Sequence, residues 1–170
     1  MRTEIASELK SLRLYGMASA WDDLLGQGET AALQSARWLL EHLLQAEGVD
    51  RAMRSVSYQM KAARFPMHRD LAGFDFEASA VERVLVSQLA SLAFTDQAHN
   101  VVLIGGPGTG KTHLASALGI AGITQHGKRV RFYSTVDLVN ALEQEKAQGR
   151  AGRIAASLLH VDLLILDELG

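Results

Sequence analysis

Cysteine is absent from this chain of 170 residues, which excludes disulfides, thiolate metal sites and cysteine nucleophiles. No apolar run is long enough to span a bilayer, and the N-terminal residues lack the apolar core of a secretory signal. No internal repeat or low-complexity linker interrupts the chain. We therefore expect a soluble, cytoplasmic protein without a membrane partner.

The charges are nearly balanced, because 17 lysine and arginine residues face 19 aspartate and glutamate residues, for a net charge of -2. At the level of the whole chain this balance argues neither for nor against nucleic acid as a partner. Hydrophobic residues make up 48% of the chain, which is enough for a globular core. The length suits one domain, or a small domain joined to part of another.

The most informative stretch is the glycine-rich sequence GGPGTGKT at positions 105–112. It satisfies G-x-x-x-x-G-K-[ST], the phosphate-binding loop of nucleoside triphosphatases. Glycines let backbone N–H groups turn toward a triphosphate without a Cβ in the way, and the following helix adds its N-terminal amides and dipole. The predicted nucleotide-binding residues are Gly105, Gly106, Pro107, Gly108, Thr109, Gly110, Lys111, Thr112 and His113.

Two residues at the end of this loop have separate expected roles. Lys111 reaches the β- and γ-phosphates as a point charge, in catalysis as well as binding, and the Thr112 hydroxyl takes one Mg²⁺ position. An apolar, β-branched run at 101–104 precedes the loop and a helical pattern follows it, which is the strand–loop–helix setting that the motif requires. A chance glycine-rich turn is the weaker interpretation, and we predict that the chain binds ATP or GTP.

A second strand pattern, at 161–166, ends in the acidic pair Asp167 and Glu168. Such an apolar run is typical of a strand buried on both faces in a parallel sheet, with the acidic pair at the carboxyl end where α/β sheets place ligands. The pattern has the form of a Walker B motif. Asp167 is predicted to hold Mg²⁺ through a water, and Glu168 to orient or deprotonate the attacking water, which favours a hydrolase over a nucleotide-binding switch.

The first 70 residues have apolar residues at helical spacing and read as helices. Thr3 and Ser35 are expected N-caps of the first and third helices. For Trp21 and Trp38 we favour core packing over a stacking role, because buried aromatics usually dominate small cores. The residues expected to point inward on the third helix are Leu39, Leu40, Leu43 and Leu44.

The segment from Arg51 to Arg69 contains five basic residues and no acidic residue, and Pro66 is expected to end the helix within it. On a helix, several of them share one face with a tyrosine. Two interpretations remain open: a solvated face of a packed helix, or a surface that contacts DNA phosphates, with the tyrosine available to a sugar or base. The DNA-binding candidates are Arg51, Arg54, Tyr58, Lys61 and Arg64.

The aromatic pair Phe74 and Phe76 has no helical period and marks the junction between two units. Its rings could line a nucleotide-base pocket or simply pack two lobes together, and packing is the more common outcome. We place the domain boundary here, with residues 1–70 as a helical domain and residues 71–170 as a nucleotide-binding unit.

The motifs GPGTGKTHLA at 106–115 and DLLILDELG at 162–170 resemble the IstB family, the AAA+ helper ATPases of insertion-sequence transposons and relatives of the DnaC helicase loaders. The segments LKSLRL at 9–14, KAARFP at 61–66 and FDF at 74–76 are similar as well, so the resemblance covers essentially the whole chain. It implies an α/β fold, a P-loop NTPase of AAA+ type with a parallel sheet, preceded by a small all-helical domain for DNA binding or assembly.

The resemblance also implies a function. Family members assemble on DNA in an ATP-dependent way as homo-oligomers and stimulate a partner transposase, so we expect ATP and Mg²⁺ as cofactors and non-specific duplex DNA as a partner. Adenine is favoured over guanine by the resemblance alone. Two alternatives stay open: a DnaC-like helicase loader, and a non-enzymatic DNA-binding remnant that poisons the assembly of intact copies.

Family members continue past the Walker B strand, whereas this sequence stops at Gly170. We therefore expect a truncated chain with an incomplete sheet of three strands, at 101–104, 130–134 and 161–166. An open sheet edge should be sticky and only marginally stable. ATP hydrolysis should be weak or absent without the family's arginine finger, which is worth about a thousandfold or more.

Overall fold

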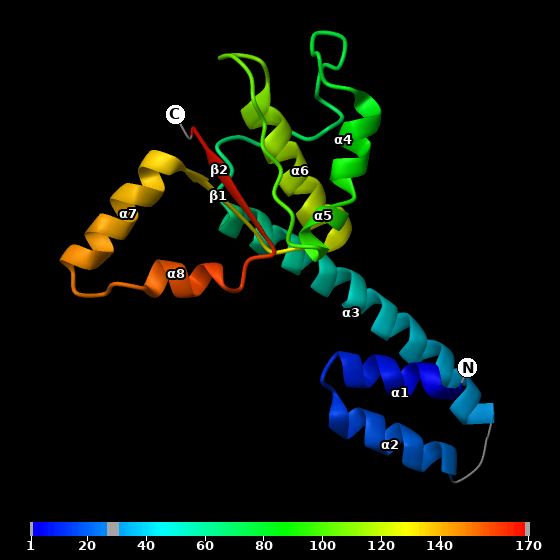
Figure 1. Ribbon diagram of the computed structural model, residues 1–170. Helices are drawn as coiled ribbons and strands as arrows, with labels where there is room; N and C mark the ends of the chain where they lie inside the picture. Colours follow the sequence, from blue (N-terminus) through cyan, green and yellow to red (C-terminus); the bar gives the residue numbers. More distant parts are fainter. Residues whose placement is uncertain (1, 27–30, 169–170) are drawn as a thin grey trace. The chain divides into compact units, whose positions relative to one another are not determined.

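The computed structural model describes residues 2–26 and 31–168, and it divides the chain into two compact units, residues 1–55 and 56–170 (Figure 1). The first unit holds helices α1 (Arg2–Ser11) and α2 (Tyr15–Gly26) and most of α3 (Ala31–Ala63). Helix α3 ends in the second unit. The domain boundary that we place at residue 70 stays a prediction.

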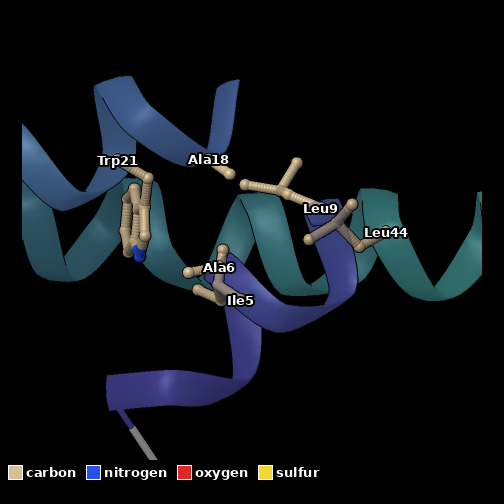
Figure 2. Packing of buried hydrophobic residues seen from close by; sticks show 6 residues of the cluster. All are labelled: Ile5, Ala6, Leu9, Ala18, Trp21 and Leu44. Atoms are coloured by element: carbon tan, nitrogen blue, oxygen red, sulfur yellow. The ribbon is translucent and has the colours of Figure 1, made fainter. Parts of the chain in front are cut away.

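The core of the first unit is formed by apolar side chains that recur at helical spacing on α1 and α2 and meet Leu44 of α3 (Figure 2). Helix α1 is closed by Arg13 in the left-handed conformation (φ 63°), with the Leu14 amide donating to the Leu9 carbonyl at 2.8 Å. The buried cluster consists of Ile5, Ala6, Leu9, Ala18, Trp21 and Leu44.

The two tryptophans have different environments. Trp21 is buried, as predicted, but the prediction for Trp38 is wrong: its side chain is 64% exposed and stacks on His42, with ring centroids 5.0 Å apart. The 33-residue helix α3 starts before Ser35, which is therefore not its N-cap. Because a single long helix presents every direction in turn, only some of its leucines reach the core. The residues expected inward and found exposed are Leu39 and Leu43.

The N-cap expected at Thr3 lies outside the side chains that the structure describes. Among the described residues, no helix has both the length and the apolar character that crossing a membrane requires.

The second unit is built around a parallel pair of strands, β1 (Val130–Ser134) and β2 (Leu163–Asp167), whose register runs from Val130 opposite Leu163 to Ser134 opposite Asp167. Helix α6 (Lys111–His126) packs against both strands. The remaining helices are α4 (Arg83–Ala90), α5 (Ala93–Asp96), α7 (Thr135–Ala147) and α8 (Arg153–Leu158). The mixed α/β class and the parallel pairing of the strands are therefore as predicted.

Helix α6 is the central element of this unit, because both of its sides are buried. One side contributes Ile123 to a cluster with Val130 and Phe132 of β1. The other contributes Leu114 and Leu118 to a second cluster. Glycine at position 119 lets the helix approach closely: a Cβ there would lie 2.7 Å from the Phe65 ring and 2.8 Å from the Ile165 side chain. The helix is thereby fixed relative to β2, which ends at Asp167.

Two strand predictions need correction. Residues 101–104 form no strand, and Val102 and Ile104 are 72% and 92% exposed. An extended segment becomes a strand only when a neighbour accepts and donates its backbone hydrogen bonds, and among the described residues β1 and β2 pair only with each other. β2 is also not buried on both faces: Ile165 is buried, but Leu164 and Leu166, which point to the opposite face, are exposed.

Candidate functional site

The glycine-rich loop leads directly into α6. Gly108 and Gly110 have φ values of 75° and 87°, the left-handed region in which glycine carries no Cβ penalty. Gly110 is the N-cap of α6, and no side chain caps the first turn. A Cβ on Gly110 would lie 3.1 Å from the Phe74 ring. The first amides of a 16-residue helix are thus presented with their dipole toward the loop, as a bound anion requires.

The Lys111 side chain lies over this loop. Its Nζ donates to the carbonyl oxygens of Gly105 at 2.8 Å and Gly106 at 2.7 Å. Both acceptors are neutral, so these contacts leave the ammonium charge uncompensated at the N-terminus of α6. A phosphate oxygen could replace either carbonyl, and it would add a charge-assisted hydrogen bond.

The carboxyl end of β2 meets the start of α6. The Thr112 hydroxyl donates to Asp167 Oδ2 at 2.7 Å, although the two residues are 55 positions apart. The Asp167 backbone carbonyl accepts a second hydrogen bond, from the Thr135 hydroxyl at 2.8 Å. A hydroxyl and a carboxylate in contact are the hard oxygen ligands that Mg²⁺ prefers, so these residues fit the ion expected here.

Glu168 follows Asp167 directly and is exposed, with a φ of 59°. This left-handed conformation is uncommon for residues other than glycine, and it comes directly after the last residue of β2. The last two residues of the motif, Leu169 and Gly170, lie outside the described residues.

An open cleft of about 440 Å³ lies beside the start of α6. His113 is at its edge, and its Nε2 lies 3.0 Å from the Asp70 carbonyl oxygen. Sequence reasoning included His113 but missed the other lining residues, because no local pattern places a loop 40 residues earlier against this helix. Those residues are His68, Arg69, Asp70, Gly73 and Asp75.

The aromatic pair next to this cleft has mainly a packing role. Phe74 is buried with Val86 of α4 and Leu114 and Leu118 of α6, and its ring makes edge contacts with Phe76 and His113. Of the two interpretations, the structure favours core packing for Phe74. The Phe74 ring also lies next to Gly110, so the hydrophobic core packs directly against the glycine-rich loop.

The DNA-binding candidates lie on α3, except Arg64, which directly follows it, and the α3 surface around Arg51 and Arg54 carries less positive charge than residues 51–69 alone indicate. In the first unit, Arg54 contacts Asp50 at 2.8 Å and Glu47 at 3.3 Å, and Arg51 contacts Glu47 at 3.4 Å. Carboxylates one or two turns earlier on a helix face these arginines, and a count that begins at Arg51 omits them. The contacts partly neutralise this pair, and they do not decide between a solvated face and a surface that contacts DNA. In the second unit, the other candidates are exposed: Tyr58, Lys61 and Arg64.

Comparisons with known proteins match a range of this chain that includes both motifs. Residues 7–170 match the family described as IstB-like ATP binding protein. An ATP-binding protein of insertion sequence IS21 from Pseudomonas aeruginosa is 35% identical over 168 residues, which cover 98% of this chain and 63% of that protein. An ATP-binding protein of insertion sequence IS5376 from Geobacillus stearothermophilus is 30% identical over 171 residues, which cover 100% of this chain and 67% of that protein. The chain thus spans about two thirds of the length of these relatives.

Proposed function

The chain belongs to the family of IstB-like ATP binding proteins, and we propose that it binds ATP with Mg²⁺ where the 105–112 loop meets the end of β2. One observation carries the proposal. The Thr112 hydroxyl and the Asp167 carboxylate are 2.7 Å apart, next to a lysine and an uncapped helix N-terminus. Anion donors and cation ligands are therefore adjacent, as a magnesium–triphosphate complex needs.

Each group in this arrangement has a distinct task. The first amides of α6 and the Lys111 ammonium bind phosphate oxygens, and the lysine exchanges the Gly105 and Gly106 carbonyls for them. Thr112 and Asp167 hold the Mg²⁺, which neutralises phosphate charge when it is bound. The open cleft beside His113 leaves room for the rest of the nucleotide.

The proposal extends from ATP binding to ATP hydrolysis. Glu168 stands next to Asp167 and is exposed, so its carboxylate can orient or deprotonate a water near the terminal phosphate. The family resemblance implies that an arginine of a neighbouring subunit completes the site. Such a residue is worth about 10³ to 10⁵ in rate, so the isolated chain should turn over slowly.

A role in transposition is supported by the relatives, which are named as ATP-binding proteins of insertion sequences. We propose that the chain acts with duplex DNA and a partner transposase, as part of a homo-oligomer. A helicase loader would share the nucleotide site but would bind a replicative helicase. A non-enzymatic remnant would lower the activity of an intact relative when the two are mixed.

The test of nucleotide binding is equilibrium titration of the full chain with a fluorescent ATP analogue and Mg²⁺, with unlabelled ATP and GTP as competitors. Lys111→Ala should weaken binding at least tenfold, because it removes the only charged donor among the loop residues 105–112. Lys146→Ala, which removes an exposed lysine of α7, is the matched control and should bind like the parent. Parent binding that Lys111→Ala leaves unchanged would refute the proposed site.

A further inference from the structure

We infer that Thr135, the first residue of α7, is a positioning residue that holds the two Walker B carboxylates in place; this inference rests on the proposed function. The Thr135 hydroxyl donates to the Asp167 backbone carbonyl at 2.8 Å. Thr135 is not the N-cap of α7: that role belongs to Ser134, whose Oγ accepts from the Asp137 amide at 3.4 Å.

The position of this contact follows from how the strand pair ends. The parallel register finishes at Ser134 opposite Asp167. Beyond that pair β1 turns into α7, so its backbone leaves the sheet. The link between the two strands is then continued by a side chain, from Thr135 to Asp167. A β-branched side chain has few χ1 rotamers, which limits the directions in which the half-buried Thr135 can point its hydroxyl.

Asp167 is consequently held from two helices. Thr112 of α6 donates to its carboxylate at 2.7 Å, and Thr135 of α7 donates to its carbonyl at 2.8 Å. The carbonyl belongs to the peptide plane that joins Asp167 to Glu168, so fixing its oxygen fixes the whole plane. The contact with Thr112 orients the carboxylate, and the contact with Thr135 restrains rotation of the peptide group that follows Asp167.

The same peptide plane determines how Glu168 leaves the strand. Its left-handed φ of 59° is unfavourable for a glutamate and persists only where the surroundings hold it. The Thr135 hydroxyl is a contact that can do this, since it holds the carbonyl directly before Glu168. Loss of the hydroxyl should let the Glu168 backbone leave this conformation, and the Asp167 carboxylate should then be less well placed for Mg²⁺.

The experiment measures the affinity of the full chain for the fluorescent ATP analogue in Mg²⁺ and in EDTA. The ratio of the two affinities is the magnesium gain. Thr135→Val keeps the size of the side chain and removes the donor. It should reduce the magnesium gain about fivefold, the equivalent of one net hydrogen bond, while the affinity in EDTA changes less than about twofold. Thr135→Ser keeps the donor and should restore most of the gain.

The matched control is Thr95→Val. Thr95 is also half-buried in the second unit, and its hydroxyl also donates to a backbone carbonyl, that of Leu92, at 2.8 Å. This variant should keep the parent's magnesium gain. An equal loss of affinity in Mg²⁺ and in EDTA for Thr135→Val would mean a merely structural role and would overturn the inference.

The remaining outcomes separate the inference from the proposed function. A parent chain that binds no analogue, or that Lys111→Ala does not weaken, overturns both. A parent that binds equally with and without Mg²⁺ overturns the magnesium assignment and the inference. If the parent and Lys111→Ala behave as proposed but Thr135→Val keeps the full gain, the inference alone fails.

Circular dichroism shows whether Thr135→Val folds. If it does not, Thr135→Cys takes its place. The cysteine thiol is a weak donor, so this variant must show a partial loss of the magnesium gain, and an unchanged gain refutes the inference.

Discussion

Arg129 and Asp162 join the starts of the two strands, and the Asp162 carboxylate accepts three hydrogen bonds from Arg129. The guanidinium donates to one carboxylate oxygen of Asp162 at 3.0 Å and to the other at 2.9 Å, and the Arg129 amide donates to the same carboxylate at 2.7 Å. The pair lies beside Val130 and Leu163, where the parallel register begins. It therefore fixes the end of the sheet opposite to Asp167.

The first prediction concerns pH. The hydrogen bond from the Arg129 side chain lowers the pKa of Asp162 from its ordinary value of 3.8 to about 2, and partial burial opposes this only in part. Because the folded pKa is below the unfolded one, the stability from this group is complete above about pH 4 and is lost as the pH falls toward about 2. Urea unfolding of the parent and of Asp162→Asn should show a stability difference that shrinks over this window.

Glu143→Gln is the control for this experiment, because it neutralises an exposed carboxylate of α7. Its stability difference from the parent should change little between pH 4 and pH 2. A difference for Asp162→Asn that stays constant over the same range would contradict the assigned role of the arginine.

The second prediction concerns helix packing. Gly119→Ala should destabilise the chain by about 1–3 kcal/mol, because the new Cβ would lie within 2.8 Å of the side chains of Phe65 and Ile165. Gly48→Ala makes the same change at an exposed position of α3 with no neighbour within 4 Å, and it should stabilise by up to about 1 kcal/mol. The midpoint of urea unfolding measures both. Equal effects at the two glycines would show that α6 does not approach the strand closely.

The third prediction concerns the proposed metal ligand. Asp167→Asn keeps the shape of the side chain and an oxygen that can accept from Thr112, but it removes the charge that attracts Mg²⁺. Nucleotide affinity in EDTA should be unchanged or slightly higher, and the gain from Mg²⁺ should fall at least tenfold, measured by titration with the ATP analogue. A variant with the parent's magnesium gain would remove Asp167 from the site.

The fourth prediction concerns DNA. Replacing Arg51 and Arg54 together by alanine should weaken duplex binding and lower the slope of log K against log salt by up to about 2, roughly one unit per lost phosphate contact. Glu47→Gln should strengthen binding, because this carboxylate contacts both arginines. Anisotropy titrations at several salt concentrations measure both effects. Lys10→Ala on α1 is the control. Unchanged affinity in every variant would return this surface to the solvated-face interpretation.

Local patterns were the most predictable part of this protein. The loop from Gly105 to Thr112 depends on neighbours in sequence: glycines that adopt positive φ, then a helix whose first amides have no cap. The burial of Ile5, Leu9 and Trp21 follows from helical spacing in the same way. Such features need no knowledge of which distant segments meet.

Other features could not be predicted locally. The 101–104 segment has the composition of a strand, yet a strand forms only with a hydrogen-bonded neighbour. Trp38 has the apolar surroundings of a core residue in the sequence, but the direction in which α3 presents it leaves it exposed against His42. The net charge around Arg51 and Arg54 does not follow from residues 51–69 alone, because their acidic partners Glu47 and Asp50 lie just before that segment.

The sequence by itself determined which groups the proposed site contains: a glycine-rich loop, a lysine, a hydroxyl and two carboxylates, each supplied by a motif of adjacent residues. Only the tertiary structure decided how these groups meet. It brings Thr112 within 2.7 Å of Asp167 and Thr135 within 2.8 Å of the carbonyl that precedes Glu168. The physical reason is that contacts between residues 32 and 55 positions apart arise from the packing of α6 and α7 with the strand pair, which is a property of the folded chain and of no single segment.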